Sequence, residues 1–258
     1  MTGMGDILMS MGEARGLHRR TRQPVLIVGR DGRPVQDHGL FHSIPYLLKR
    51  SPEDREFQLL VNGPGLRPYI AAKSSECWTW KPYRPQPAEL VFTREELDFA
   101  EPYRGRIMIE PTIKACGHHN KAWPAANWHK LVDLLRAGGI PLVQCAPKGV
   151  SPVADRVALT PTFRHAAAVL SLSAGFIGTE GGLMHAAAAV GTPAIILWSE
   201  YVAPEITGYD AHRNLRHAGQ ACGRRQDCHG CQASMEAITP DEVLDHLGEL
   251  ISFRNFKQ

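Results

Sequence analysis

Residues 175–198, GFIGTEGGLMHAAAAVGTPAIILW, decide the fold class of this 258-residue chain. The run Gly175–Gly178 predicts a short buried strand that ends in a glycine-rich turn. Residues 182–190 then predict a helix, and the apolar run Ala194–Trp198 predicts a second strand. Because a strand, a helix and a strand in this order form a right-handed crossover, the segment indicates a parallel sheet.

Short apolar runs and amphipathic stretches alternate along the rest of the chain as well. Strands are predicted at residues 24–29, 57–61, 89–92, 106–109 and 142–145. Helices are predicted at residues 7–20, 124–136, 163–172 and 240–251. Thr93 and Thr239 are capping residues, each with a glutamate three positions later, and a short helix is expected after Thr93. Residues 30–56 and 62–88 are rich in proline, glycine and charge and give no clear pattern.

A polar, turn-forming stretch at Glu101–Gly105 separates the two halves. We therefore expect two Rossmann-like α/β domains, residues 1–102 and 103–258, with a cleft between them. Ligands of such folds bind beyond the carboxyl ends of the strands.

The composition is that of an ordinary globular protein. Hydrophobic residues make up 43% and charged residues 21%, which excludes a disordered or fibrous chain. No apolar run is long enough to predict a transmembrane helix, and Met1–Ser10 does not resemble a secretory signal. We therefore expect a cytoplasmic protein. The net charge of +3 is too small to indicate nucleic-acid binding.

Two local clusters leave alternatives open. Arginines gather near the start of the chain, either on a solvated helix face or on a surface that binds an anionic acceptor; they are Arg15, Arg19, Arg20, Arg22, Arg30 and Arg33.

Of six cysteines, Cys77, Cys116 and Cys145 are isolated, whereas Cys222, Cys228 and Cys231 form Cys-x5-Cys-x2-Cys. A structural zinc site usually has two ligand pairs, so we expect reduced structural cysteines and no metal.

The turn at residues 180–183 is a candidate phosphate site. The backbone N–H groups of Gly181, Gly182 and Leu183 would be unpaired at a helix N-terminus, and with the helix dipole they favour an anion. The segment is neither GxGxxG nor a Walker loop. The alternative is an ordinary tight turn with a buried His185.

Two further residues are candidates for the site. Lys121 lies in the loop after a predicted strand, where it could neutralise a phosphate, or it is an ordinary surface lysine. Asp6 follows Gly5 in the first turn of the first helix. It is either a helix-capping carboxylate or a general base.

Together these segments resemble glycosyltransferase family 9, the ADP-heptose:lipopolysaccharide heptosyltransferases. The resemblance rests on Gly-Asp-Ile-Leu at 5–8, Lys-x-Trp-Pro-x-x-x-Trp at 121–128 and Glu-Gly-Gly-Leu-x-His-x-x-Ala-Ala-x-Gly-Thr-Pro at 180–193. It continues in Thr207-Gly208-Tyr209 and in the cysteine loop before Ile238. It implies a GT-B fold with the donor on the C-terminal half. The N-terminal domain is expected to be reduced, because the family's buried strand before Gly-Asp is not obvious here.

The resemblance also implies the chemistry. A heptose-like sugar would pass from a nucleotide-diphosphate-sugar donor, with an ADP-linked donor as one candidate, to an acceptor hydroxyl, usually with inversion and without a metal or other cofactor. Asp6 matches the family's proposed base, and Lys121 matches the lysine that contacts the donor phosphates. The donor loop corresponds to Glu180, Gly181, Gly182, Leu183 and His185. The family usually has Asp in place of Glu180 and Ser or Thr in place of Gly181.

The expected partners are a nucleotide-sugar and an acceptor glycan or lipopolysaccharide core, and we expect a monomer. One alternative is transfer to a modified base in DNA, with Tyr69, Trp78, Trp80 and Tyr83 as stacking residues, although such a cluster also fits domain packing. A second alternative is a non-catalytic relative that only binds nucleotide-sugars.

Overall fold

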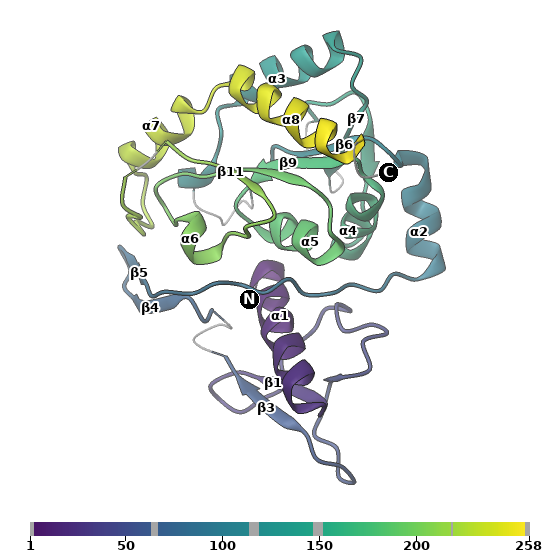
Figure 1. Ribbon diagram of the computed structural model, residues 1–258. Helices are drawn as coiled ribbons and strands as arrows, with labels where there is room; N and C mark the ends of the chain where they lie inside the picture. Colours follow the sequence, from purple (N-terminus) through teal and green to yellow (C-terminus); the bar gives the residue numbers. More distant parts are fainter. Residues whose placement is uncertain (1–2, 63–66, 114–118, 147–151, 218, 256–258) are drawn as a thin grey trace.

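Each half of the chain builds a parallel sheet (Figure 1). The computed structural model describes residues 3–62, 67–113, 119–146, 152–217 and 219–255, so Cys116 and most of the turn after residue 61 lie outside the described residues. In the N-terminal half β1 (Val25–Val28) lies between β2 (Leu47–Leu48) and β3 (Gln58–Val61).

The C-terminal half contains six parallel strands in the order β11-β10-β9-β6-β7-β8. Their bounds are Ile107–Glu110 (β6), Leu142–Ala146 (β7), Val157–Leu159 (β8), Gly175–Thr179 (β9), Ala194–Leu197 (β10) and Arg213–Leu215 (β11). The parallel α/β architecture predicted from the alternation of runs is confirmed.

Helices cover both faces of the larger sheet, as its fully buried apolar strands require. One face packs against α3 (Ala125–Ala137) and α8 (Pro240–Asn255), with α7 (His229–Ala237) beside them. The other face packs against α4 (Phe163–Leu172) and α5 (Gly182–Val190), which lie on the side of the sheet that faces the N-terminal half (Figure 1). A single turn of helix, α6 (Pro204–Thr207), follows β10.

The first helix joins the two halves. α1 (Met4–Thr21) is buried continuously from Asp6 to Gly12, because the smaller sheet packs on one side of it and α5 on the other. Ile7, Leu8 and Met11 therefore share one hydrophobic core with α4 and α5. The buried part of α1 is thus enclosed by elements of both halves.

A hairpin from the N-terminal half is attached to the C-terminal half. It consists of β4 (Ile70–Lys73) and β5 (Trp78–Trp80). The Trp78 N–H donates to the Gly223 carbonyl at 2.9 Å, and the Trp80 indole N–H donates to the Tyr201 carbonyl at 3.1 Å. These bonds place the hairpin beside the residues that follow β10.

The strand predicted at residues 89–92 is wrong. That stretch belongs to no sheet, and carbonyl groups in and beside it accept hydrogen bonds from arginine side chains instead. Arg15 donates to the carbonyls of Pro87 and Ala88, both at 3.2 Å, and Arg164 donates to the Val91 carbonyl at 2.6 Å.

The short helix after this stretch forms as the capping box predicts. α2 (Arg94–Ala100) begins with reciprocal bonds between Thr93 and Glu96 and continues into the 3₁₀ turn η2 (Glu101–Tyr103). It packs against α4 of the C-terminal half. The domain boundary at residue 102 remains a prediction.

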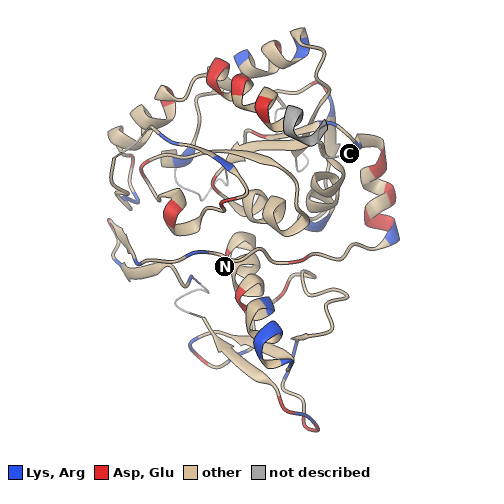
Figure 2. Ribbon diagram, viewed as in Figure 1, with Lys and Arg blue, Asp and Glu red and all other residues tan. Residues whose placement is uncertain are grey.

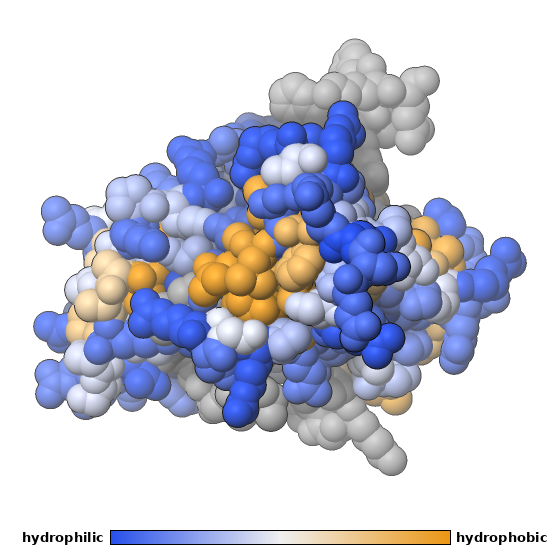
Figure 3. Space-filling view, turned by 90° about the horizontal axis from the view of Figure 1, so that it is seen from below, coloured by the Kyte–Doolittle hydropathy of each residue, from blue (hydrophilic) through white to orange (hydrophobic). Residues whose placement is uncertain are grey.

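The smaller sheet is partly open on the face away from α1. Leu59 and Val61 of β3 are 55% and 56% exposed, and Figure 3 shows an apolar patch within a polar rim at this end of the molecule. Among the described residues, no helix is long and apolar enough to span a bilayer.

Candidate active site

Asp6 lies at the beginning of α1, where the two halves meet. Its carboxylate pairs with the Arg67 guanidinium, with 2.9 Å between Nε and Oδ2, and accepts the Gly3 backbone N–H at 3.2 Å. The Tyr69 hydroxyl donates to Oδ1 at 3.4 Å. Burial raises the pKa of Asp6 above its usual value, and the Arg67 charge only partly opposes this effect. The carboxyl is therefore a stronger base than an exposed aspartate.

Lys121 and Glu180 form an ion pair in the C-terminal half. Lys121 ends the 3₁₀ turn η3 (His119–Lys121) ahead of α3, and Glu180 follows the carboxyl end of β9. Both side chains are mostly buried, and the Lys121 ammonium also lies 4.9 Å from the centroid of the Tyr201 ring. The candidate lysine therefore points toward the candidate donor loop and is not an ordinary surface lysine.

The N-terminus of α5 carries no side-chain cap. Gly181 is the N-cap residue, and because glycine has no side chain the helix has no side-chain cap hydrogen bond from this position. The first N–H groups of α5 have no partner within the helix, and the positive end of the helix dipole lies at the same place. The geometry suits an oxyanion, as the sequence predicts for residues 181–183.

His185 lies one turn into α5, fully enclosed. Its Nδ1 is 2.9 Å from the Tyr209 hydroxyl, and burial lowers its pKa to about 4, so the ring is neutral at physiological pH. Its other edge faces α1: a Cβ on Gly5 would lie 2.7 Å from His185 Cδ2 and 3.5 Å from the Gly182 Cα. The Gly-Asp and Gly-Gly segments therefore meet directly.

The candidate residues from both halves share one electrostatic environment. The charges of Glu180 and Lys121 both influence the pKa of Asp6, although they lie in the other half of the chain. The structure thus brings Asp6, Lys121, Glu180, His185 and the N-terminus of α5 together.

A cation-rich surface adjoins Asp6. Arg67, Lys73 and Arg225 lie over the Trp78 ring, at 5.0, 4.9 and 5.2 Å from its centroid. Burial lowers the pKa of Lys73, and the positive charges of Arg67 and Arg225 lower it further. The group therefore creates a positive potential beside the candidate base.

Most of the arginines that the sequence singled out lie away from this surface. Arg19, Arg20 and Arg22 are exposed at the far end of α1 (Figure 2), about 20 Å along the helix from Asp6 at 1.5 Å per residue. Arg33 is exposed as well, whereas Arg30, which is also exposed, lies close enough to Lys73 for its charge to lower the pKa of that lysine. Sequence reasoning missed Arg67, which lies beyond the carboxyl end of β3. The rule that ligands bind at that end of a parallel strand is the signal that points to it.

The three clustered cysteines lie next to one another. The Sγ atom of Cys222 is 3.4 Å from that of Cys231 and 3.9 Å from that of Cys228, and all three lie within 4.8 Å. The thiol hydrogen bond from Cys231 lowers the pKa of Cys222. Three thiols suit a soft metal ion, but a closed tetrahedral site needs a fourth ligand. Among the described residues no fourth His, Cys, Asp or Glu joins the group.

Several solved structures are similar to this chain. Escherichia coli ADP-heptose lipopolysaccharide heptosyltransferase II is 17% identical, over 99% of this chain and 98% of that one, with a TM-score of 0.66. A glycosyltransferase family 9 protein from Veillonella parvula is 11% identical over 96% and 94%, with a TM-score of 0.64. The iron-containing dodecameric glycosyltransferase TibC from enterotoxigenic E. coli is 14% identical over 97% and 74%, with a TM-score of 0.64. No curated protein sequence matches the chain.

These similarities show the fold, which is GT-B with two Rossmann-like domains and a smaller N-terminal sheet. The family is shown by sequence. The model of glycosyltransferase family 9 (heptosyltransferase) matches residues 81–231, which is more than half of the chain. The match includes Lys121 and the whole donor loop but not Asp6. The chain therefore belongs to glycosyltransferase family 9, the heptosyltransferase family.

Proposed function

We propose that this protein transfers a heptose-like sugar from a nucleotide-diphosphate-sugar to an acceptor hydroxyl, with inversion and without a metal. The observation that carries the proposal is the meeting of a buried carboxylate from one half with a cation and a helix N-terminus from the other. ADP is the first nucleotide to test, because a similar structure is named an ADP-heptose enzyme. The cytoplasm, where nucleotide-sugars are made, is the expected setting.

In the proposed reaction Asp6 removes the proton from the acceptor hydroxyl. The acceptor oxygen forms a bond to the anomeric carbon, and the bond from that carbon to the diphosphate oxygen breaks. The nucleoside diphosphate leaves with the electron pair. Lys121 and the free N–H groups of α5 stabilise the charge that develops on it. A single displacement of this kind inverts the anomeric centre.

Glu180 and His185 have positioning roles in this proposal. Glu180 holds the Lys121 ammonium in the C-terminal half before a donor arrives. His185 is neutral, so it presents a polar edge to the donor without adding charge, and the Tyr209 hydroxyl fixes its ring. Both assignments follow from contacts and not from the family alone.

The acceptor is proposed to carry an anionic group near its reacting hydroxyl. The support is the set of cations on Trp78, because Arg67 touches Asp6 directly while Lys73 and Arg225 extend the positive surface away from it. A lipopolysaccharide-core sugar with a carboxylate or phosphate fits this surface. DNA is also anionic, so both acceptor classes belong in the assay.

The test begins with a thermal-shift screen of nucleotide-sugars, since a donor that binds only the folded state raises its stability. Lys121→Ala should weaken binding of the stabilising donor. Lys130→Ala is the matched control, because Lys130 is an exposed lysine on α3 that pairs with Asp241. Equal donor affinity in the two variants would contradict the role of Lys121.

Product formation then decides between enzyme and binding protein. Asp6→Ala should abolish both transfer and slow donor hydrolysis while donor binding persists. If the wild-type protein binds a nucleotide-sugar but neither transfers nor hydrolyses it, the chain is a non-catalytic relative. A response to UDP-sugars alone would contradict the ADP-linked donor.

A further inference from the structure

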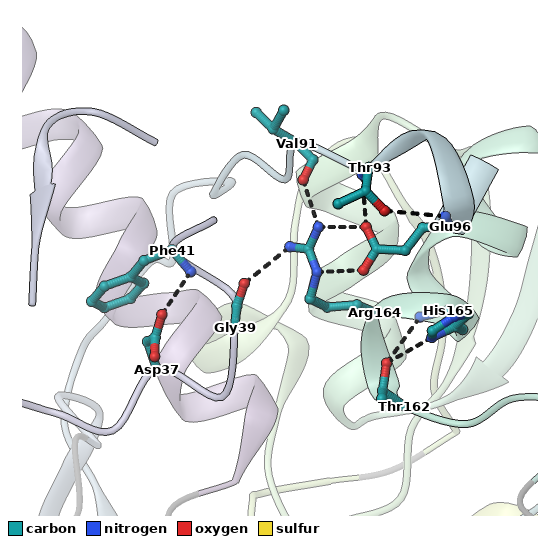
Figure 4. Close-up of polar contacts among 9 residues, drawn as sticks. All are labelled: Asp37, Gly39, Phe41, Val91, Thr93, Glu96, Thr162, Arg164 and His165. Atoms are coloured by element: carbon teal, nitrogen blue, oxygen red, sulfur yellow. Dashed lines mark hydrogen bonds and ion pairs between the residues drawn. The ribbon is translucent and has the colours of Figure 1, made fainter. Parts of the chain in front are cut away.

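The N-terminus of α4 carries a buried arginine that joins three separate segments (Figure 4). Arg164 donates from Nε and Nη2 to the two carboxylate oxygens of Glu96, each at 2.6 Å. Nη2 also donates to the Val91 carbonyl at 2.6 Å, and Nη1 donates to the Gly39 carbonyl at 3.1 Å. Both charged side chains are at least nine-tenths buried.

The bonds of Arg164 differ in what they connect. Glu96 lies in the first turn of α2, which precedes the predicted boundary at residue 102 but packs on α4, so the bidentate pair holds α2 against the C-terminal half. Gly39 belongs to the loop between β1 and β2 of the N-terminal half. Its neighbours Leu40 and Phe41 are buried in the core that contains α1. The bond to Gly39 therefore ties the smaller sheet and its helix to α4.

The same end of α4 borders the candidate site. Phe163 precedes Arg164, and a Cβ on Gly182 would lie 3.2 Å from the Phe163 ring. Gly182 in turn faces Gly5, the neighbour of Asp6. One helix terminus thus contacts the donor loop through Phe163 and holds the N-terminal half through Arg164.

We propose that Arg164 is a positioning residue that fixes the N-terminal half against the C-terminal half and so keeps Asp6 at the donor site. The inference rests on the proposed function, because it concerns the alignment of its base. Glu96 holds the guanidinium plane of Arg164 in a fixed orientation, because the two parallel hydrogen bonds of a bidentate pair fix the plane. A lysine at this position could not form such a pair. The remaining N–H groups then hold the Gly39 loop at a defined place.

Gly39 offers a way to disturb this link without removing a charge. Gly39 has a φ of +81°, and a Cβ built on it would lie 3.3 Å from the Arg164 Cδ. Gly32, in the same loop, has a φ of +73° and nothing within 4 Å of its Cβ position. Gly39→Ala and Gly32→Ala therefore both place an alanine in the left-handed backbone region, at a similar cost in stability. Only Gly39→Ala brings a Cβ close to the Arg164 side chain.

The experiment compares these two variants with the wild-type protein. Urea titration first shows that the wild-type protein and both variants are folded in the absence of denaturant. ADP affinity, donor turnover and small-angle X-ray scattering are then measured in that buffer. Gly39→Ala should lower kcat by about tenfold or more, because a small misplacement of a catalytic group has that effect. Its ADP affinity and donor KM should stay unchanged, and its radius of gyration should increase. Gly32→Ala should match the wild type throughout.

A second pair of variants tests the arginine itself. Arg164→Gln alone leaves Glu96 buried without its cationic partner and is expected to unfold readily. Arg164→Gln/Glu96→Gln removes both charges, and it should bind ADP normally and lose kcat as Gly39→Ala does. Rescue of kcat by Arg164→Lys would contradict the need for the planar fork.

The outcomes separate this inference from the proposed function. If Gly39→Ala and Gly32→Ala have equal kcat and equal scattering curves, Arg164 only stabilises the fold and the inference is overturned. If the wild-type protein turns over no nucleotide-sugar, the proposed function fails. The scattering comparison then still shows whether Arg164 fixes the two halves.

Discussion

Replacing Gly5 by alanine should misplace the base while leaving the rest of the protein folded. Gly5 lies in the first turn of α1 and faces the first turn of α5. An added Cβ would lie 2.7 Å from His185 Cδ2, which is 0.7 Å short of ordinary van der Waals contact at 3.4 Å. His185 has little room to retreat, because it is 2% exposed and bonded to Tyr209. The helix that carries Asp6 must therefore shift.

The size of the effect follows from this shortfall. Overpacking a well-packed contact costs about 1–3 kcal/mol, whereas alanine in place of glycine stabilises a helix by up to about 1 kcal/mol. The net loss of stability should therefore be about 1 kcal/mol. A shift of the catalytic group approaching 1 Å can cost about a hundredfold in rate. We expect Gly5→Ala to lose about ten- to a hundredfold in kcat with donor affinity nearly unchanged.

Gly248→Ala is the matched control. Gly248 lies inside α8, and a Cβ on it would touch nothing within 4 Å. The control should gain up to about 1 kcal/mol and keep full turnover. Urea titration gives the two free energies of unfolding, and donor turnover is measured where all variants are folded. If Gly5→Ala gains stability as the control does and keeps its kcat, the two helix termini do not meet as described.

Three other results are expected. Asp6→Asn should abolish turnover and raise the free energy of unfolding at neutral pH. The reason is that the pKa of Asp6 in the folded protein lies above the ordinary value of 3.8. The wild-type protein therefore loses stability as the pH rises through that folded-state pKa, and above it the ionised carboxylate costs stability that asparagine does not. Urea titrations near pH 3.8 should show the two proteins converging, and a constant difference would contradict this. Tyr209→Phe leaves a nitrogen of the buried His185 without its partner and should cost about 1–3 kcal/mol, measured in the same way. Metal analysis of purified protein should find no stoichiometric zinc or iron, because only three thiols converge among the described residues; one equivalent that is lost in Cys231→Ser would refute this.

The sequence predicted the four central strands of the C-terminal sheet but not its edge strands β8 and β11, and the predicted elements are those whose signals are local. The helices at residues 163–172 and 182–190 have the predicted bounds, since Thr162 caps the first and glycines bracket the second. The capping box at Thr93 and Glu96 likewise acts over three residues. Such features need no knowledge of distant segments.

The N-terminal half was harder to predict because its partners are far apart in the chain. β2 has only two residues, and its place is set by pairing with β1. The stretch at 89–92 has the composition of a strand, but arginines from α1 and α4 bond the carbonyls in and beside it. The Arg164–Glu96 pair spans 68 positions. No local sequence pattern around Arg15 or Arg164 predicts which residue it bonds.

Asp6 also shows why one motif carries two readings. The sequence leaves it as either a helix cap or a base, and the structure gives its carboxylate the geometry of a cap: Oδ2 accepts the N–H of Gly3 at the beginning of α1. A carboxylate at this position also interacts favourably with the dipole of α1. At the N-terminus of α5 the N-cap residue is Gly181, which has no side chain that could cap the helix. The asymmetry leaves the α5 amides for a donor and fixes Asp6 beside them. The two readings are therefore compatible, and substitutions separate them. Asparagine retains an oxygen that can cap α1 but removes the base, whereas alanine removes both, so the difference in stability between Asp6→Asn and Asp6→Ala isolates the cap.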